Sequence, residues 1–257
     1  MPPQPPRTLP RPWILLLPVL LAGCGGNWGW HVVDPFDARG RANLGFMAEG
    51  LWATVSLSLA AILLSVLLGT AVALLGFSRY RALRLANRLW VELFRAVPIL
   101  VLILWVFYGL PVVLGIRLDV FTAALLAIAI CDSAFEAEIL RGGIQSIEQG
   151  QREGAAALGL SRWQTMRFVI LPQAVRRILP PIANQFVYVV KMSSLASVIG
   201  YQDLTRRANE LVVSVFRPLE IYTILILEYL VLILLISAGT RWLERRLGAD
   251  QGRRRDG

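Results

Sequence analysis

The stretch that decides the fold is residues 50–78, GLWATVSLSLAAILLSVLLGTAVALLGFS, which contains no charged residue. A transmembrane helix needs about 20 consecutive apolar residues to cross the hydrocarbon core of a bilayer, so this run is long enough. The composition of the whole chain agrees, since 56% of the residues are hydrophobic and 17% are charged, against about 25% charged in soluble proteins. The sequence therefore predicts an integral membrane protein.

Further apolar runs follow the first one along the chain, at residues 96–116, 120–139, 178–200 and 219–240. Together with the first run they predict an all-α integral membrane protein with five core transmembrane helices. We expect these helices to form one permease-like transmembrane domain over residues 50–240. A polar stretch, roughly residues 141–177, separates the third run from the fourth.

The arginines predict how the helices are oriented. They gather in the segment SRYRALRLANR (78–88) and in the basic tail 241–257, and cytoplasmic segments of membrane proteins retain Lys and Arg. With five spans between them, the segment 25–49 then lies outside the cytoplasm and the tail inside it. The alternation of sides places the polar stretch 141–177 in the cytoplasm as well.

The first 24 residues have a different character. The apolar run 13–23 is about 16 Å long as a helix, which is short against a hydrocarbon core of about 30 Å, and Arg7 and Arg11 precede it, as in a secretory signal. The sequence LAGC (21–24) resembles the lipobox of bacterial lipoproteins, in which Cys24 is lipidated and becomes the first residue. The alternative is a short uncleaved helix or anchor. Both leave 25–49 extracytoplasmic.

Charge and motifs exclude several kinds of function. The net charge of +9 comes from arginines at the ends of apolar runs, which is typical of membrane orientation and not of nucleic-acid binding. The two cysteines do not have the spacing of a metal site, and no cofactor motif occurs. No phosphate-binding G-x-x-x-x-G-K-[ST] sequence is present. We therefore expect no enzyme, and ATP chemistry would have to come from another chain.

The polar stretch has the pattern of two helices joined by a turn. Residues 148–158 are rich in helix formers, and Gly159 follows where a helix would stop. Ser161 and Gln164 form the capping-box pattern S-x-x-Q, which predicts that a second helix begins there. Pro172 is expected to bend or end that second helix. A solvated connector is the alternative that periodicity alone does not exclude.

This stretch also resembles the EAA motif of permease subunits in bacterial ATP-binding-cassette importers. The motif has E-A-A, three residues, G, nine residues and I-x-L-P, and the spacing is the same here. Gly154 replaces an alanine and Val169 replaces the isoleucine. The matching residues, which the resemblance assigns to coupling with the ATPase, are Glu153, Gly154, Ala155, Gly159, Leu171 and Pro172.

Three more segments resemble the polar-amino-acid branch of that family, the histidine, glutamine and arginine permeases. The first, VELFRAVPILVLILWVFYGLP (91–111), departs from the branch at Leu102, where glutamine is frequent. The others are AEILRGGIQSI (137–147) and KMSSLASVIGYQDL (191–204). The four matches occur in order and cover most of the chain from about residue 50 onward.

The resemblance implies a function and a set of partners. The chain would be the permease of an ATP-driven importer of polar amino acids in the bacterial inner membrane. It would work as a dimer with a second copy or a homologous permease. A cytoplasmic ATPase dimer would dock on residues 150–160, and an extracytoplasmic solute-binding protein would deliver the substrate. The alternatives are an ion-coupled secondary carrier, or a membrane assembly protein anchored to membrane lipid.

Ionisable residues within the apolar runs are candidates for the substrate pathway, because a charge at the bilayer centre costs at least about 2.5–3.5 kcal/mol unless it meets water or a partner. Asp132 and Glu136 are four residues apart and share a helix face. Asp132 would meet a substrate ammonium group, or else form a structural pair with Lys191. Glu136 would line the pathway or reach toward the interface. The candidate pathway residues are Asp132, Glu136, Lys191 and Ser194; Glu228 has no assigned role.

Overall fold

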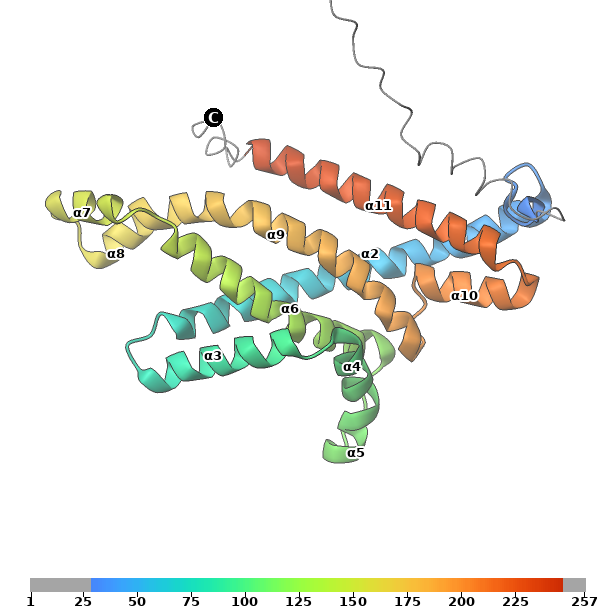
Figure 1. Ribbon diagram of the computed structural model, residues 1–257, viewed down its shortest axis with the longest axis horizontal. Helices are drawn as coiled ribbons and strands as arrows, with labels where there is room; N and C mark the ends of the chain where they lie inside the picture. Colours follow the sequence, from blue (N-terminus) through green and yellow to red (C-terminus); the bar gives the residue numbers. More distant parts are fainter. Residues whose placement is uncertain (1–28, 247–257) are drawn as a thin grey trace, which may run out of the picture.

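The computed structural model describes residues 29–246, and all regular elements in this range are helices. Figure 1 shows an elongated bundle in which the long helices run in roughly the same direction, with α7 and α8 at one end and α10 near the other. Cys24, the segment 1–24 and the last part of the basic tail, 247–257, lie outside the described residues. Lipidation of Cys24 therefore stays a prediction.

The first long helix, α2 (Ala38–Gly76), follows a short 3-10 turn, η1 (Trp30–Val33), and begins earlier than the sequence predicts. The side chain of Asp37 caps it by accepting hydrogen bonds from the backbone N–H groups of Arg39 and Gly40. The expected boundary between residues 49 and 50 thus lies inside one continuous helix. Its first turns are stabilised by Met47, which packs against α10 and α11.

The second span is broken, and the arginine-rich loop before it is mostly helical. Helix α3 (Arg81–Ala96) begins within the segment expected to be a loop. It is followed by α4 (Ile99–Leu104), the π-helical turn η2 (Trp105–Gly109) and α5 (Leu110–Leu114), and the chain bends by 100° between α3 and this second part. Pro98 is the physical reason, because a proline disfavours the helical conformation of the residue before it.

The third span is α6 (Val120–Gln145), and the loop after it carries α7 (Gln149–Ala157) and α8 (Arg162–Gln164). A π-helical turn, η3 (Thr165–Ile170), continues directly into α9 (Leu171–Ser193) and η4 (Ser194–Ile199). Pro172 was expected to bend or end this helix, and it does not end it, because η3 continues into α9. The wide π turn just before it accommodates a residue that lacks a backbone N–H.

The chain closes with α10 (Leu204–Val215) and α11 (Pro218–Arg246). Asp203 caps α10 by accepting from the backbone N–H of Arg206 at 2.8 Å, and burial raises the pKa of this carboxyl to about 7. Four helices of the described chain are long and apolar enough to cross a membrane, and the bent pair of α3 with α4–α5 makes five. The predicted all-α membrane fold is confirmed, with four spans, or five where the bent pair counts as one span.

Small residues bring α2 and α6 into close contact at the centre of the bundle. A Cβ atom placed on Gly69 of α2 would lie 2.5 Å from Cβ of Glu136 and 2.9 Å from the carbonyl oxygen of Ser133. Ala127 and Ala134 of α6 are fully buried. In a membrane, where lipid is as apolar as the helix surface, such close backbone approach is a main source of helix association. Gly69 therefore sets the distance between α2 and α6.

We predict that Gly69→Ala destabilises the purified protein by about 1–3 kcal/mol, because the added methyl group overpacks the α2–α6 contact. Gly45→Ala is the matched control on the same helix, since a Cβ there meets nothing within 4 Å. This control should be neutral or stabilising by roughly 0.5–1 kcal/mol. Thermal unfolding in detergent measures both variants, and equal midpoints for the two would contradict the assignment.

Candidate functional site

The loop between α6 and α9 turns at Gly159. This residue has a φ of 76°, a left-handed conformation that glycine adopts without strain. Its N–H donates to the carbonyl of Ala156 at 2.9 Å, and the N–H of Leu160 donates to the carbonyl of Ala155 at 3.1 Å. This is the Schellman pattern that closes helix C-termini. The predicted helix end at Gly159 is confirmed.

The second helix of the loop, α8, begins after Ser161, as the sequence predicts. The backbone N–H of Gln164 donates to the hydroxyl of Ser161 at 3.3 Å, and the N–H of Ser161 donates to the side-chain oxygen of Gln164 at 2.8 Å. These reciprocal bonds form a capping box. Gly159 and Ser161 together give the loop a defined shape between two helices.

The loop is held firmly against the membrane-spanning helices. The guanidinium of Arg177 on α9 donates to the carbonyl of Ser146 at the end of α6. The amide of Gln173 donates to the side chain of Gln151 on α7 at 3.1 Å. A buried apolar cluster beneath the loop connects α6 with α9 and consists of Ile147, Ile170, Ala174 and Ile178. These contacts connect the loop and α7 with α6 and α9.

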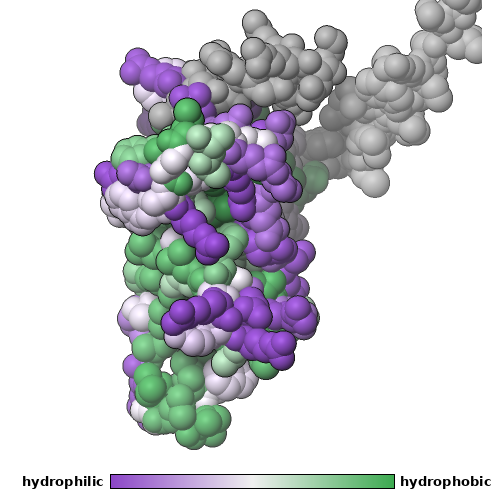
Figure 2. Space-filling model, turned by 90° about the vertical axis from the view of Figure 1, so that its left-hand side faces the viewer, coloured by the Kyte–Doolittle hydropathy of each residue, from purple (hydrophilic) through white to green (hydrophobic). Residues whose placement is uncertain are grey.

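The outer surface of the loop is apolar in several places. Leu158, Trp163 and Phe168 are exposed by 82%, 65% and 61%, and the Trp163 and Phe168 rings meet edge to face. Figure 2 looks at this end of the molecule, where hydrophobic and hydrophilic side chains are mixed. Exposed apolar side chains gathered outside the membrane are typical of a protein–protein contact.

The EAA-like residues divide between this surface and the interior. Glu153 is exposed and accepts a hydrogen bond from Gln149 one turn earlier, at 2.8 Å. A side chain at Gly154 would point into open space, so the alanine usual at this position would fit. Ala155 is buried against the rest of the protein, whereas Leu171 and Pro172 are exposed.

Asp132 is buried between α2, α6 and α9, and it does not pair with Lys191. Its carboxylate accepts from the hydroxyl of Ser65 on α2 at 2.6 Å and from the amide of Gln185 on α9. Only 2% of Asp132 is exposed. Sequence reasoning missed Ser65 and Gln185; the polar Gln185 within an apolar span was the signal that could have found one of them.

Glu136 lies one turn further along α6 and is completely buried. Within residues 29–246 neither of its carboxylate oxygens has a hydrogen-bond partner. Its stem contacts Gly69, so the side chain lies in the helix interface and does not extend to the membrane surface. Nearby, the indole N–H of Trp90 donates to the hydroxyl of Ser133 at 3.0 Å, which ties α3 to α6.

A polar stripe on α9 is exposed although it lies within a membrane-spanning helix. Asn184, Tyr188 and Lys191 are spaced by four and three residues, so they share one face of the helix, and all three are exposed. Ser194 follows and donates its hydroxyl proton to the carbonyl of Lys191 at 2.7 Å. Of the candidate pathway residues, Lys191 is thus on an open face, whereas Asp132 is buried behind it.

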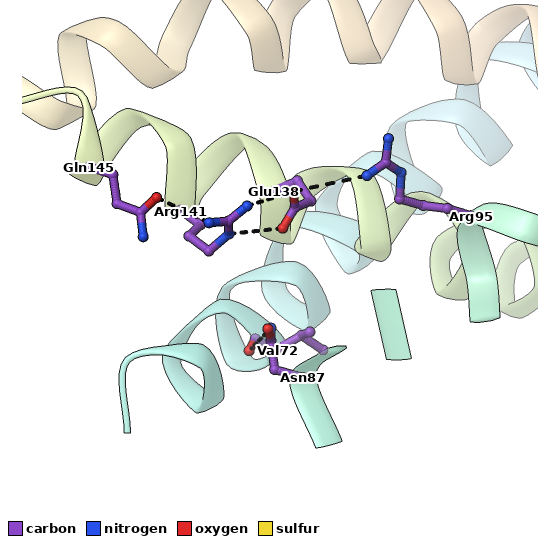
Figure 3. A network of polar contacts seen from close by, with 6 residues as sticks. All are labelled: Val72, Asn87, Arg95, Glu138, Arg141 and Gln145. Carbon is purple, nitrogen blue, oxygen red and sulfur yellow. Dashed lines mark hydrogen bonds and ion pairs between the residues drawn. The ribbon is translucent and has the colours of Figure 1, made fainter. Parts of the chain in front are cut away.

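Glu138 and Arg141, near the end of α6, form a network of charged side chains with Arg95 of α3. Two guanidinium nitrogens of Arg141 donate to Glu138, at 2.8 and 2.9 Å, and the third donates to the side chain of Gln145 at 3.0 Å. Arg95 of α3 approaches the Glu138 carboxylate at 3.9 Å. Asn87 of α3 donates to the carbonyl of Val72 at 2.8 Å. Figure 3 shows these contacts, which fasten α3 to α2 and α6.

Glu228 is the remaining ionisable group within a span. It lies on α11, and its Oε2 atom is buried and has no hydrogen-bond partner among the described residues. Apolar side chains of α2 and α11, including Leu51 and Val231, line the groove that contains it.

The fold is that of a polytopic helical membrane protein in which two short helices, α7 and α8, lie in the loop between α6 and α9. Residues 61–249 match the family described as binding-protein-dependent transport system inner membrane component. This match covers more than half of the chain, and the chain belongs to this family. The resemblance noted in the EAA-like segment is therefore confirmed, and neither an ion-coupled carrier nor a lipid-anchored assembly protein is favoured.

Several individual members of this family are similar to this chain in sequence or structure. The glutamine transport system permease protein GlnP of Escherichia coli (strain K12) is 43% identical over 184 residues, which are 70% of this chain and 84% of that protein. The arginine transport system permease protein ArtQ of Bacillus subtilis (strain 168) is 33% identical over 205 residues, 80% of this chain and 94% of that protein. A chain in the crystal structure of an amino acid ABC transporter with histidines superposes with a TM-score of 0.76 at 37% identity, covering 80% of this chain and 96% of that one.

We predict that Asp132→Asn leaves protein abundance nearly unchanged. The substituted amide can still accept from Gln185, and it can donate to Ser65, whose hydroxyl then donates to the carbonyl of Ile62, 3.0 Å away. Asp132→Leu leaves the amide of Gln185 without its acceptor, whereas the Ser65 hydroxyl can still donate to the Ile62 carbonyl, so the variant should cost about 1–3 kcal/mol. Membrane abundance and thermal unfolding measure both. Rescue of Asp132→Leu by Lys191→Met would contradict this, because the two residues form no ion pair.

Proposed function

We propose that this chain is the permease subunit of an ATP-driven importer of polar amino acids. The named relatives, which carry glutamine and arginine in their descriptions, support this substrate class. The chain would form the pathway as a dimer, with a second copy or a homologous permease. ATP would be hydrolysed by separate subunits at the α7 end, which the positive-inside rule places in the cytoplasm, and a solute-binding protein would dock on the opposite side, near α10.

The observation that carries this proposal is the polar stripe of Asn184, Tyr188 and Lys191 on α9. An ammonium group facing hydrocarbon is unfavourable, so exposed polar residues in a span normally face a partner or a water-filled cavity. In a permease pair, this face of α9 would line the pathway between the two copies.

Lys191 is suited to the group that all amino acids share. Its ammonium would contact the α-carboxylate of the substrate, which contributes affinity without selecting among side chains. Asp132 and Glu136, which are buried, would support the polar stripe from inside the helix bundle. Asp132 holds Gln185, the neighbour of Asn184 on α9, and so fixes how the helix presents its polar stripe. Ser194 would keep the end of α9 in place through its bond to the Lys191 carbonyl.

We predict that Lys191→Met reduces uptake of every transported amino acid roughly tenfold or more at normal abundance, because a hydrogen bond to a charged group contributes about 1.5–3 kcal/mol. Lys191→Arg keeps the charge and should retain most of the activity. Uptake into vesicles that contain the assembled transporter measures both. Full uptake by Lys191→Met would show that the ammonium group does not contact the substrate.

The α7 loop would transmit the motion of the ATPase. Its exposed surface around Leu158, Trp163 and Phe168 would be the docking surface, with Glu153 contributing a charge. Because the loop is anchored to α6 and α9 by Arg177 and by the apolar cluster beneath it, a rigid-body shift of the ATPase would reach the polar stripe.

We predict that Gly159→Val uncouples ATP hydrolysis from uptake. A β-branched residue in the left-handed region costs about 1–2 kcal/mol, which is relieved by a change in the turn and hence in the orientation of α7. Gly159→Asn is the matched control, since asparagine tolerates this conformation. The ratio of ATP hydrolysed to amino acid transported, measured in proteoliposomes, should rise for Gly159→Val alone. An unchanged ratio would argue against the coupling role.

A further inference from the structure

A basic pocket lies between the end of α2, the length of α3 and the end of α6, on the same side of the bundle as α7. Its volume is about 390 Å³ and it is open to the outside. The charged side chains that line it are Arg84, Arg88, Arg95, Arg141, Glu92 and Glu138. Figure 3 shows its inner wall, where Asn87 fastens α3 to α2 and the Glu138 network joins α3 to α6.

The pocket has an excess of positive charge, with four arginines against two glutamates. Glu138 is already neutralised, because Arg141 holds it with two hydrogen bonds and Arg95 approaches it. One terminal nitrogen of Arg84 donates to the carbonyls of Ser78 and Arg79, each at 2.9 Å.

In the part of the chain that the structure describes, the side chain of Arg88 takes part in no hydrogen bond or ion pair. The mouth of the pocket is therefore suited to an anion.

Apolar side chains border the mouth. Leu85, Leu89 and Leu93 follow one another at intervals of four residues along α3, and each is exposed by more than half. With 3.6 residues per turn, each of these leucines is turned about 100° around the helix from the residue before it, so the row flanks the row of Arg84, Arg88 and Glu92. A ligand with an anionic head and apolar tails would contact both rows. A soluble anion would use only the arginines.

We propose that this pocket binds the phosphate of an anionic phospholipid, with the acyl chains along the leucine row of α3. Arginine pairs well with phosphate through its planar array of donors, and basic pockets between transmembrane helices at the cytoplasmic surface bind anionic head groups. A phosphate held by Arg84 and Arg88 of α3 would lie in the pocket beside the end of α6, the helix that leads into α7.

Native mass spectrometry tests this proposal on the full chain, purified in detergent with the subunits that copurify and incubated with phosphatidylglycerol and phosphatidylethanolamine in equal amounts. The wild type should retain phosphatidylglycerol in preference. The double variant Arg84→Gln, Arg88→Gln should retain it at least about tenfold less, since each arginine near the membrane surface contributes about fivefold. The matched control is Arg79→Gln, Arg81→Gln, which removes the same charge outside the pocket and should behave as wild type.

A second variant is expected to gain binding, so a folding defect in the Arg84→Gln, Arg88→Gln variant cannot explain both results. Glu92→Gln removes the carboxylate at the mouth that is not held by an arginine, and it should increase retention of phosphatidylglycerol. Equal losses in the pocket variant and its control, or unchanged retention in Glu92→Gln, would overturn the proposal. Displacement of the lipid by glycerol phosphate at comparable concentration would also overturn it, because the site would then bind soluble phosphates.

Discussion

Close contact between α2 and α6 is the constraint on which the rest of the structure depends. In a bilayer, apolar side chains gain little by leaving lipid for another helix, so association relies on packing and hydrogen bonds. Gly69 brings the backbone of α2 against α6, and Gly143 does the same for α6 against α9, where a Cβ would lie 2.2 Å from the side chain of Ile178. Glycine at these positions allows polar groups to meet across the interfaces.

This packing separates structural polar groups from exposed ones. Asp132 is enclosed with Ser65 and Gln185, and the carboxylate of Glu136 is enclosed without a hydrogen-bond partner among residues 29–246. Lys191 and Tyr188 of α9 are exposed. The same helices continue into the α7 loop, where Arg177 and the buried apolar cluster hold it. One rigid unit thus connects the loop with the polar stripe.

The sequence alone predicted those features that depend on residues close together in the chain. Hydropathy predicted the spans, Gly159 predicted the end of α7, and Ser161 with Gln164 predicted the capping box, because each depends on residues a few positions apart. The helical start at Ala38 was missed since it rests on Asp37 and on tertiary packing of Met47. The bend before α4 could have been inferred from Pro98. The partners of Asp132 could not, because Ser65 and Gln185 are 67 and 53 residues away from it in the chain.

The central claim is that the exposed stripe of α9 faces a water-filled pathway, and its solvent accessibility tests this most directly. Asn184→Cys and Tyr188→Cys, in the transporter assembled in membranes with its ATPase, would be treated with a charged thiol reagent with and without ATP. Leu67→Cys, at an exposed apolar position of α2, is the comparison facing lipid. The account predicts labelling of both stripe positions at rates that change with ATP, and little labelling at Leu67→Cys. Stripe positions as unreactive as Leu67→Cys in an active transporter would contradict it.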